Sequence, residues 1–346
     1  MRLGLGTWRF FLAFLVVISH LWSGMIDGPA AYAVWGFFIL SGFLMTHVLR
    51  HKYGETRGGL TDYAYNRFLR IYPAYVVAVL AGAACLFILP KFGVTLSDLN
   101  PQFNWPHSAR EWAANVLLIA LPAPGLFVPV SGALAVEVCV YVLMPLLAFS
   151  RAAAWTSLIL SVLLNLKLGL TIETFGERYS SFLTCFMVFS CGCLLSQYRE
   201  KLNILRAPLL SVVVWLLHGL IWLKYNQWPW TYGLYASIVL SGWVVLSLSS
   251  QKTGKLDTVL GDLSYPLYLF HTTVAVCLMP FGIAMRSFEF FALSFILTIV
   301  VSWAIVVLID RPLAQLKKKN VERAQSSASN TSAEVFQLKK NNVESA

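Results

Sequence analysis

The sequence predicts an all-α fold, a polytopic membrane protein with about ten transmembrane helices around a polar cavity. Of its 346 residues, 58% are hydrophobic and only 12% are charged, and the mean hydropathy is +0.68. A soluble domain of this length does not need so much apolar surface. Apolar segments of about bilayer length recur along the chain. Several of them carry ionisable residues, which we expect to line a cavity rather than to face lipid.

Ten apolar segments account for most of the chain, and each is close to the length that spans a hydrocarbon core. In chain order they are 8–24, 31–49, 69–90, 132–149, 153–170, 181–197, 208–224, 231–249, 263–281 and 288–309. They predict a transmembrane domain over residues 1–312. Residues 313–346 are polar and basic, so we expect them to form a disordered cytoplasmic tail near lipid headgroups.

The distribution of basic residues sets the expected orientation. With a cytoplasmic N-terminus, 20 of the 26 Lys and Arg residues fall on the cytoplasmic side and 6 on the outer side. This asymmetry follows the positive-inside rule, and an even number of spans returns the C-terminus to the cytoplasm. The net charge of +10 is therefore explained by topology and by contact with membrane lipids. No soluble segment interleaves basic and aromatic residues, so we expect no nucleic-acid partner.

The first span carries two ionisable residues, Arg9 and His20, eleven positions apart. At 100° per residue both side chains leave the same face of a helix, separated by about 16 Å along its axis. They cannot touch, and the pair suggests a long anionic ligand that lies along the helix. In the alternative interpretation, Arg9 is an interfacial anchor and His20 is satisfied by a neighbouring helix.

Two arginines, Arg67 and Arg70, stand at the mouth of the third span, where a charged cytoplasmic loop over residues 50–70 ends. Because they are three positions apart, they are neighbours on a helix surface. Either residue alone is explained as a positive-inside anchor. Two adjacent guanidinium groups, however, also form a fork for phosphate oxygens.

A carboxylate, Glu137, lies about five residues into the fourth span, where packing alone does not explain it. Counted at 1.5 Å per residue, Glu137 and His20 lie about 8 Å and about 12 Å below the outer edge of the core. These depths permit the carboxylate to pair with the imidazole and fix its tautomer, although they do not place the two helices side by side. The outer connection before this span, 91–131, is interpreted as an acceptor-site wall, a lid or an interfacial helix.

Three polar residues of the ninth span, Ser264, Tyr268 and His271, fall on one helix face. Together they predict the wall of a ligand channel that starts at the cytoplasmic side, although Ser264 alone is more simply a packed residue. All six cysteines fall inside predicted spans, and the Cys-x-Cys at 191–193 has no companion ligands. We therefore expect neither a disulfide framework nor a metal site.

Taken together, these motifs resemble the integral-membrane acyltransferase-3 family of bacterial glycan O-acyltransferases. The resemblance covers about residues 8–312 and rests on six elements in the same order. They are the Arg-x10-His of Arg9 and His20, GFFILSGFLM from Gly36, RFLRIYPAY from Arg67, LAVEVCVYVLMP around Glu137, LSYPLYLFH ending at His271, and Asp310-Arg311-Pro312. Two positions depart from the family pattern. Gly132-Ala133 stands where Trp-Ser is frequent, and Asp310 stands where Glu is usual.

The resemblance implies a membrane-bound O-acyltransferase of the bacterial inner membrane. Its donor would be acyl-CoA, most commonly acetyl-CoA, and its acceptor a hydroxyl of a surface glycan or exopolysaccharide unit, free or lipid-linked. In this interpretation Arg9, Arg67 and Arg70 bind the phosphates of coenzyme A. The donor's pantetheine arm is flanked by Ser264, Tyr268 and His271. His20 then acts as a general base oriented by Glu137, or alternatively carries the acyl group covalently.

A second class, a multi-span transporter or flippase of a lipid-linked glycan, also suits many spans with buried charges. The sequence shows no internal repeat and no matching pair of Gly/Pro-broken helices, and a transporter has no specific use for the Arg-x10-His motif. A non-catalytic membrane scaffold is disfavoured because it requires neither His20 nor Glu137.

Overall fold

The computed structural model describes residues 3–24 and 29–315, and in these ranges the chain is helical without any β-strand. The all-α class is therefore confirmed. The longer helices are α1 (Leu5–Leu21), α2 (Pro29–Val48), α3 (Arg57–Ile88), α5 (Ser131–Phe149), α6 (Arg151–Leu168), α8 (Phe182–Gln197), α9 (Pro208–Leu220), α10 (Tyr232–Leu248), α11 (Lys255–Val276) and α12 (Phe288–Ile305). Two short helices, α4 (Ala109–Leu117) and α7 (Phe175–Ser180), lie in connections.

Each predicted span overlaps one of these longer helices. Five helical segments are long and apolar enough to cross a membrane, namely Ala30–Tyr53, Arg57–Phe92, Ser131–Phe149, Arg151–Leu168 and Phe288–Gln315. Four others, which contain α1, α8, α9 and α10, are apolar but only 10–17 residues long. The chain is thus a multi-pass membrane protein, whereas the number of ten spans stays a prediction.

Two helices, α3 and α11, begin well before the predicted starts of their spans. The predicted third span starts at residue 69, but α3 begins at Arg57, where the Thr56 hydroxyl caps it by accepting the backbone N–H of Gly59 at 3.1 Å. Much of the expected loop over 50–70 is therefore helical. The ninth span starts at residue 263 in the prediction, whereas α11 begins at Lys255. At the other end of the chain, the predicted disordered tail beyond Gln315 lies outside the described residues.

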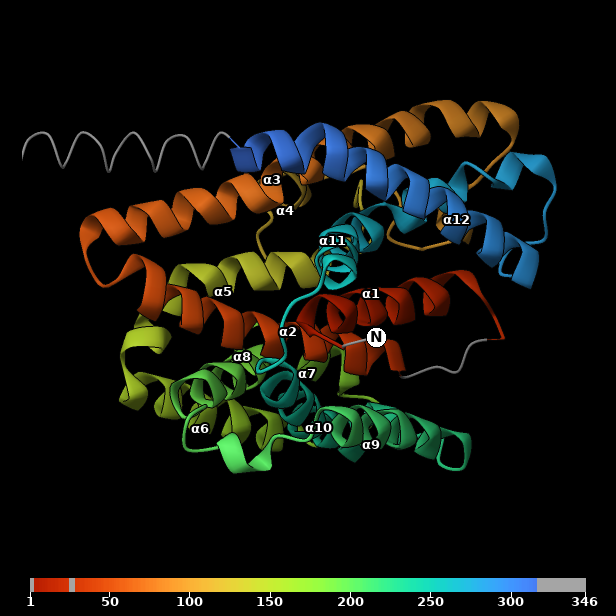
Figure 1. The fold of residues 1–346 in the computed structure, drawn as a ribbon. Helices are drawn as coiled ribbons and strands as arrows, with labels where there is room; N and C mark the ends of the chain where they lie inside the picture. The colour runs from red at the N-terminus through yellow and green to blue at the C-terminus, as the bar shows by residue number, and fades with distance from the viewer. Residues whose placement is uncertain (1–2, 25–28, 316–346) are drawn as a thin grey trace, which may run out of the picture.

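The centre of the molecule is a succession of packed helices in which α11, α1, α2 and α8 each contact the next. Figure 1 shows α3 and α12 along one side of this centre and α6, α9 and α10 along the opposite side. Helix α3 packs against α11, and α5 packs against α2. Residues from the first third and the last quarter of the chain are therefore brought together.

Helices α1 and α11 run parallel in close contact. Near their starts, Thr7 donates its backbone N–H and its hydroxyl to Asp257 Oδ1 at 2.7 and 2.9 Å; near their ends, His20 lies beside His271. Glycine permits this approach, because a Cβ at Gly6 would lie 2.0 Å from the Asp257 backbone oxygen. The parallel packing therefore brings together the polar faces of α1 and α11, which were predicted separately from the sequence.

Candidate active site

A cavity of about 120 Å³ between α1, α2, α3, α5 and α11 contains six of the eight predicted site residues. These six are Arg9 from α1, Arg67 and Arg70 from α3, Glu137 from α5, and Ser264 and Tyr268 from α11. Apolar residues of α2, among them Phe37, form much of the remaining wall. Four helices that are far apart in the sequence thus place their polar residues around one space.

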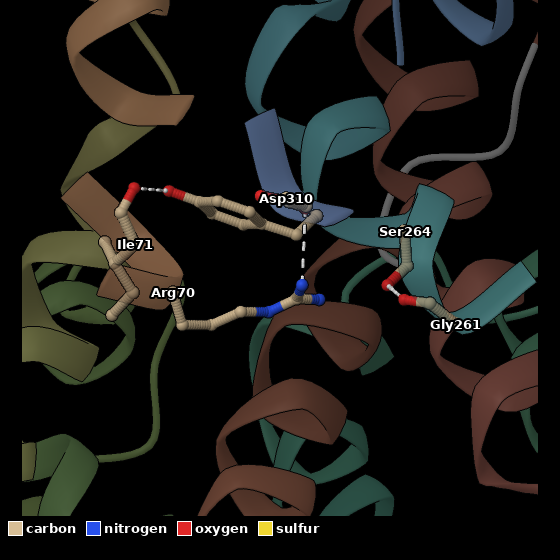
Figure 2. Close-up of polar contacts among 6 residues, drawn as sticks. Arg70, Ile71, Gly261, Ser264 and Asp310 are labelled. Carbon is tan, nitrogen blue, oxygen red and sulfur yellow. Dashed lines mark hydrogen bonds and ion pairs between the residues drawn. The ribbon is translucent and has the colours of Figure 1, made fainter. Parts of the chain in front are cut away.

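The three arginines of this cavity differ in their partners. Arg70 Nη1 lies 3.3 Å from Asp310 Oδ2, and the Asp310 side chain is only 11% exposed. Figure 2 shows the two side chains directed toward each other. Within the described ranges, Arg9 and Arg67 form neither a hydrogen bond nor an ion pair, and the Nε of Arg67 is buried without an acceptor. Buried polar groups normally have partners. Three guanidinium groups against the carboxylates of Glu137 and Asp310 leave the cavity positive, which suits an anionic ligand.

The predicted pairing of Glu137 with His20 does not form. The hydroxyls of Ser41 and Tyr141 instead both donate to Glu137 Oε1. The reason lies in the helix order, because α2 packs against both α1 and α5 and supplies Ser41 to the carboxylate. Glu137 therefore orients hydroxyl groups on the cavity wall.

His20 lies beside His271 rather than beside a carboxylate. The Nδ1 of His20 is 3.4 Å from the Nε2 of His271, and the two ring centroids are 5.2 Å apart. His20 is partly exposed and occupies the last turn of α1, which ends at Leu21, whereas the predicted span continued to residue 24. Both histidines lie outside the lining of the cavity.

Tyr268 connects the cavity with the histidine pair. Its side chain lines the cavity, its ring centroid is 6.3 Å from that of His271, and its hydroxyl donates to the Val130 backbone oxygen at 2.6 Å. The other polar residue of this face, Ser264, donates its hydroxyl to the Gly261 backbone oxygen of its own helix at 2.7 Å (Figure 2). The predicted polar face of α11 thus faces the cavity at one end and His20 at the other.

Three polar residues of the cavity were not predicted as site residues, namely Ser41, Tyr141 and Tyr265. Tyr265 donates its hydroxyl to the Ile71 backbone oxygen at 2.9 Å and so ties α11 to α3. One signal was available for Tyr141, which lies four residues after Glu137 and hence on the same helix face. Ser41 offered only its polarity within an apolar run.

The connection between α3 and α5 is a folded, hydrogen-bonded segment. Glu111, in the first turn of α4, accepts hydrogen bonds from the Ser108 hydroxyl at 2.9 Å and from the backbone N–H groups of Gly125 and His107 at 3.1 and 3.3 Å. The Ser108 hydroxyl, followed by these backbone groups, lowers the pKa of the Glu111 carboxyl from its ordinary value. Asn115 adds a hydrogen bond to the Gly125 backbone oxygen at 2.9 Å.

A family model described as an acyltransferase domain matches residues 2–307. The chain therefore belongs to the acyltransferase-3 family, as its motifs suggested. No curated protein and no solved structure matches the chain. With its long apolar helices, the protein is a membrane acyltransferase.

Proposed function

We propose that the protein transfers an acyl group, acetyl in the commonest case, from acyl-CoA to a hydroxyl of a bacterial surface glycan or exopolysaccharide unit. It does so in the inner membrane with both termini in the cytoplasm. The observation that carries the proposal is the cavity in which Arg9, Arg67 and Arg70 meet the polar face of α11. Family membership favours acyl transfer over the transporter interpretation.

The donor suits this arrangement by its charge and by the order of its parts. Coenzyme A carries phosphates at one end and its thioester at the other, and the arginines bind the phosphates through charge-assisted hydrogen bonds. The pantetheine arm then follows Ser264 and Tyr268 along α11. Because His20 is about 16 Å beyond Arg9 along α1, the thioester end of a donor lying along this helix is directed toward the imidazole.

The chemical step uses His20 as a general base. The acceptor hydroxyl oxygen attacks the thioester carbonyl carbon while the imidazole takes the hydroxyl proton. The carbon–sulfur bond then breaks, and the departing sulfur takes the proton from the imidazolium. The products are a glycan ester and free coenzyme A. The partial exposure of His20, at the end of α1 opposite Arg9, supports access for the acceptor from the other side.

The test is the transfer of labelled acetyl groups from acetyl-CoA to extracted glycans by the purified protein. General base catalysis supplies about 10²- to 10⁴-fold, so His20→Ala is expected to lower turnover by at least about 10²-fold. The matched control is His107→Ala, which removes an exposed imidazole of the outer connection. Turnover of His20→Ala near that of the wild type would contradict the assignment of the base. Movement of a glycan without gain of an acyl mass would favour the flippase.

A further inference from the structure

We infer that His271 is a positioning residue that fixes the tautomer of His20 and leaves His20 Nε2 as the free, basic nitrogen. The inference rests on the proposed function, in which His20 is the base. It assigns to His271 the orienting role that was predicted for Glu137, and it separates His271 from donor binding.

The proton on His271 is located by its backbone contact. Nδ1 of His271 lies 2.7 Å from the Tyr268 backbone oxygen. A carbonyl oxygen only accepts hydrogen bonds, so this Nδ1 carries a hydrogen. His271 is fully buried and forms no ion pair within residues 3–24 and 29–315, and a second ring proton would leave a buried charge without a counter-ion. The ring is therefore neutral, and its Nε2 is an acceptor.

This acceptor determines the tautomer of His20. His271 Nε2 lies 3.4 Å from His20 Nδ1, so the hydrogen between them belongs to His20 Nδ1. The Nε2 of a neutral His20 then keeps its lone pair for the acceptor proton. Contacts of catalytic groups are often long before substrate binds and shorten in the reacting complex, which is compatible with 3.4 Å here.

Burial separates the roles of the two rings. The His271 side chain is 0% exposed, whereas that of His20 is partly exposed at the end of α1. Only His20 is accessible to a substrate, and His271 acts through it. The carbonyl that orients His271 belongs to Tyr268, whose hydroxyl is held by Val130 and whose side chain lines the donor cavity. The hydrogen bonds therefore run from Tyr268 through His271 to His20, and Tyr268 is itself held by its hydrogen bond to Val130.

Two amides of different length test the inference. The amide of His271→Gln reaches the position of Nε2 and offers an oxygen to His20. The amide of His271→Asn reaches only the position of Nδ1 and keeps the backbone contact alone. We expect kcat to stay within about tenfold of wild type for His271→Gln and to fall by about 10²-fold or more for His271→Asn, which approaches the loss of the base itself. The KM for acetyl-CoA should change by less than about threefold in both variants, since His271 lies outside the donor cavity.

Other results would overturn the inference. Equal kcat for both variants, or the reverse order, would show that His271 does not act through its Nε2. His20→Ala, measured beside them, separates the two proposals. If it is active, the proposed base is wrong; if it is inactive while His271→Asn retains wild-type kcat, only the positioning role is wrong.

A measurement on the wild-type protein does not depend on how the variants fold. Nitrogen-15 NMR of histidine-labelled protein distinguishes ring nitrogens that carry a hydrogen from those that do not. The expected result for His20 is a protonated Nδ1 and an unprotonated Nε2. A hydrogen on Nε2 of the neutral ring would contradict the inference directly.

Discussion

Arg67 differs from the other arginines of the cavity because its buried Nε has no acceptor in the described part of the chain. Arg70 already forms an ion pair with Asp310. A bound phosphate would supply the acceptor that Arg67 lacks, and a hydrogen bond to a charged group contributes about 1.5–3 kcal/mol. Of the three arginines, Arg67 is therefore the one whose substitution is expected to lower donor affinity most.

The substitution Arg67→Gln is expected to raise the KM for acetyl-CoA by about 10- to 100-fold, the range that this energy corresponds to, with a smaller change in kcat. Arg67→Lys should recover part of the loss, because it keeps the charge but not the planar fork. The control is Arg57→Gln, an exposed arginine at the start of the same helix and outside the cavity. Steady-state kinetics measures all three variants. An unchanged KM in Arg67→Gln would contradict donor binding in this cavity.

At the residue level, helix periodicity predicted which side chains share a face. It grouped Arg67 with Arg70 and Ser264 with Tyr268, and the structure places these four residues around one cavity. Periodicity does not predict which helices are neighbours. The partner of Glu137 therefore could not be derived from depth alone, and Ser41 from the intervening α2 was missed.

The site depends on the contact between α1 and α11 at the scale of helices. The glycines near the start of α1 allow the two backbones to touch, and the paired Thr7 and Asp257 fix their register. This contact places Arg9 and His20 opposite the polar face of α11. The sequence predicted both faces from their spacing but contained no local signal for their juxtaposition.

Gly6→Ala tests this contact. The added Cβ would lie 2.0 Å from the Asp257 backbone oxygen, so the helices must separate, and overpacking of this kind costs about 1–3 kcal/mol. We expect a lower unfolding temperature and weaker coenzyme A binding, measured by thermal unfolding and by calorimetry in detergent. Gly219→Ala in α9 is the control, because no atom lies within 4 Å of its added Cβ. Equal behaviour of the two variants would mean that the close approach does not position the site.

The connection around α4 is predicted to lose stability in acid. The lowered pKa of Glu111 means that its carboxylate stabilises the folded connection above the ordinary glutamate pKa of 4.5, and that this contribution disappears as the pH falls through the lowered value. Fluorescence of Trp105 and Trp112, followed from about pH 6 to about pH 3, should show this transition. Ser108→Ala should move it to higher pH, and Glu111→Gln should abolish it. A transition that persists in Glu111→Gln would assign the acid sensitivity to another group.

For the whole molecule, composition was sufficient to predict a helical membrane protein, because so apolar a chain has few other stable forms. The starts of α3 and α11 were predicted too late, since their first turns are polar and hydropathy does not detect them. The structure places Arg9 and His20 at opposite ends of α1, with α11 parallel beside it. In the proposed function, a donor bound near Arg9 and an acceptor that enters at the other end of α1 meet at His20.

The most direct test of this account is an experimental structure of the protein with bound coenzyme A. We expect the phosphates within hydrogen-bond distance of Arg67 and at least one of Arg9 and Arg70, and the sulfur directed along α11 toward His20. Coenzyme A bound elsewhere, or bound in this cavity with its sulfur directed away from His20, would contradict the account.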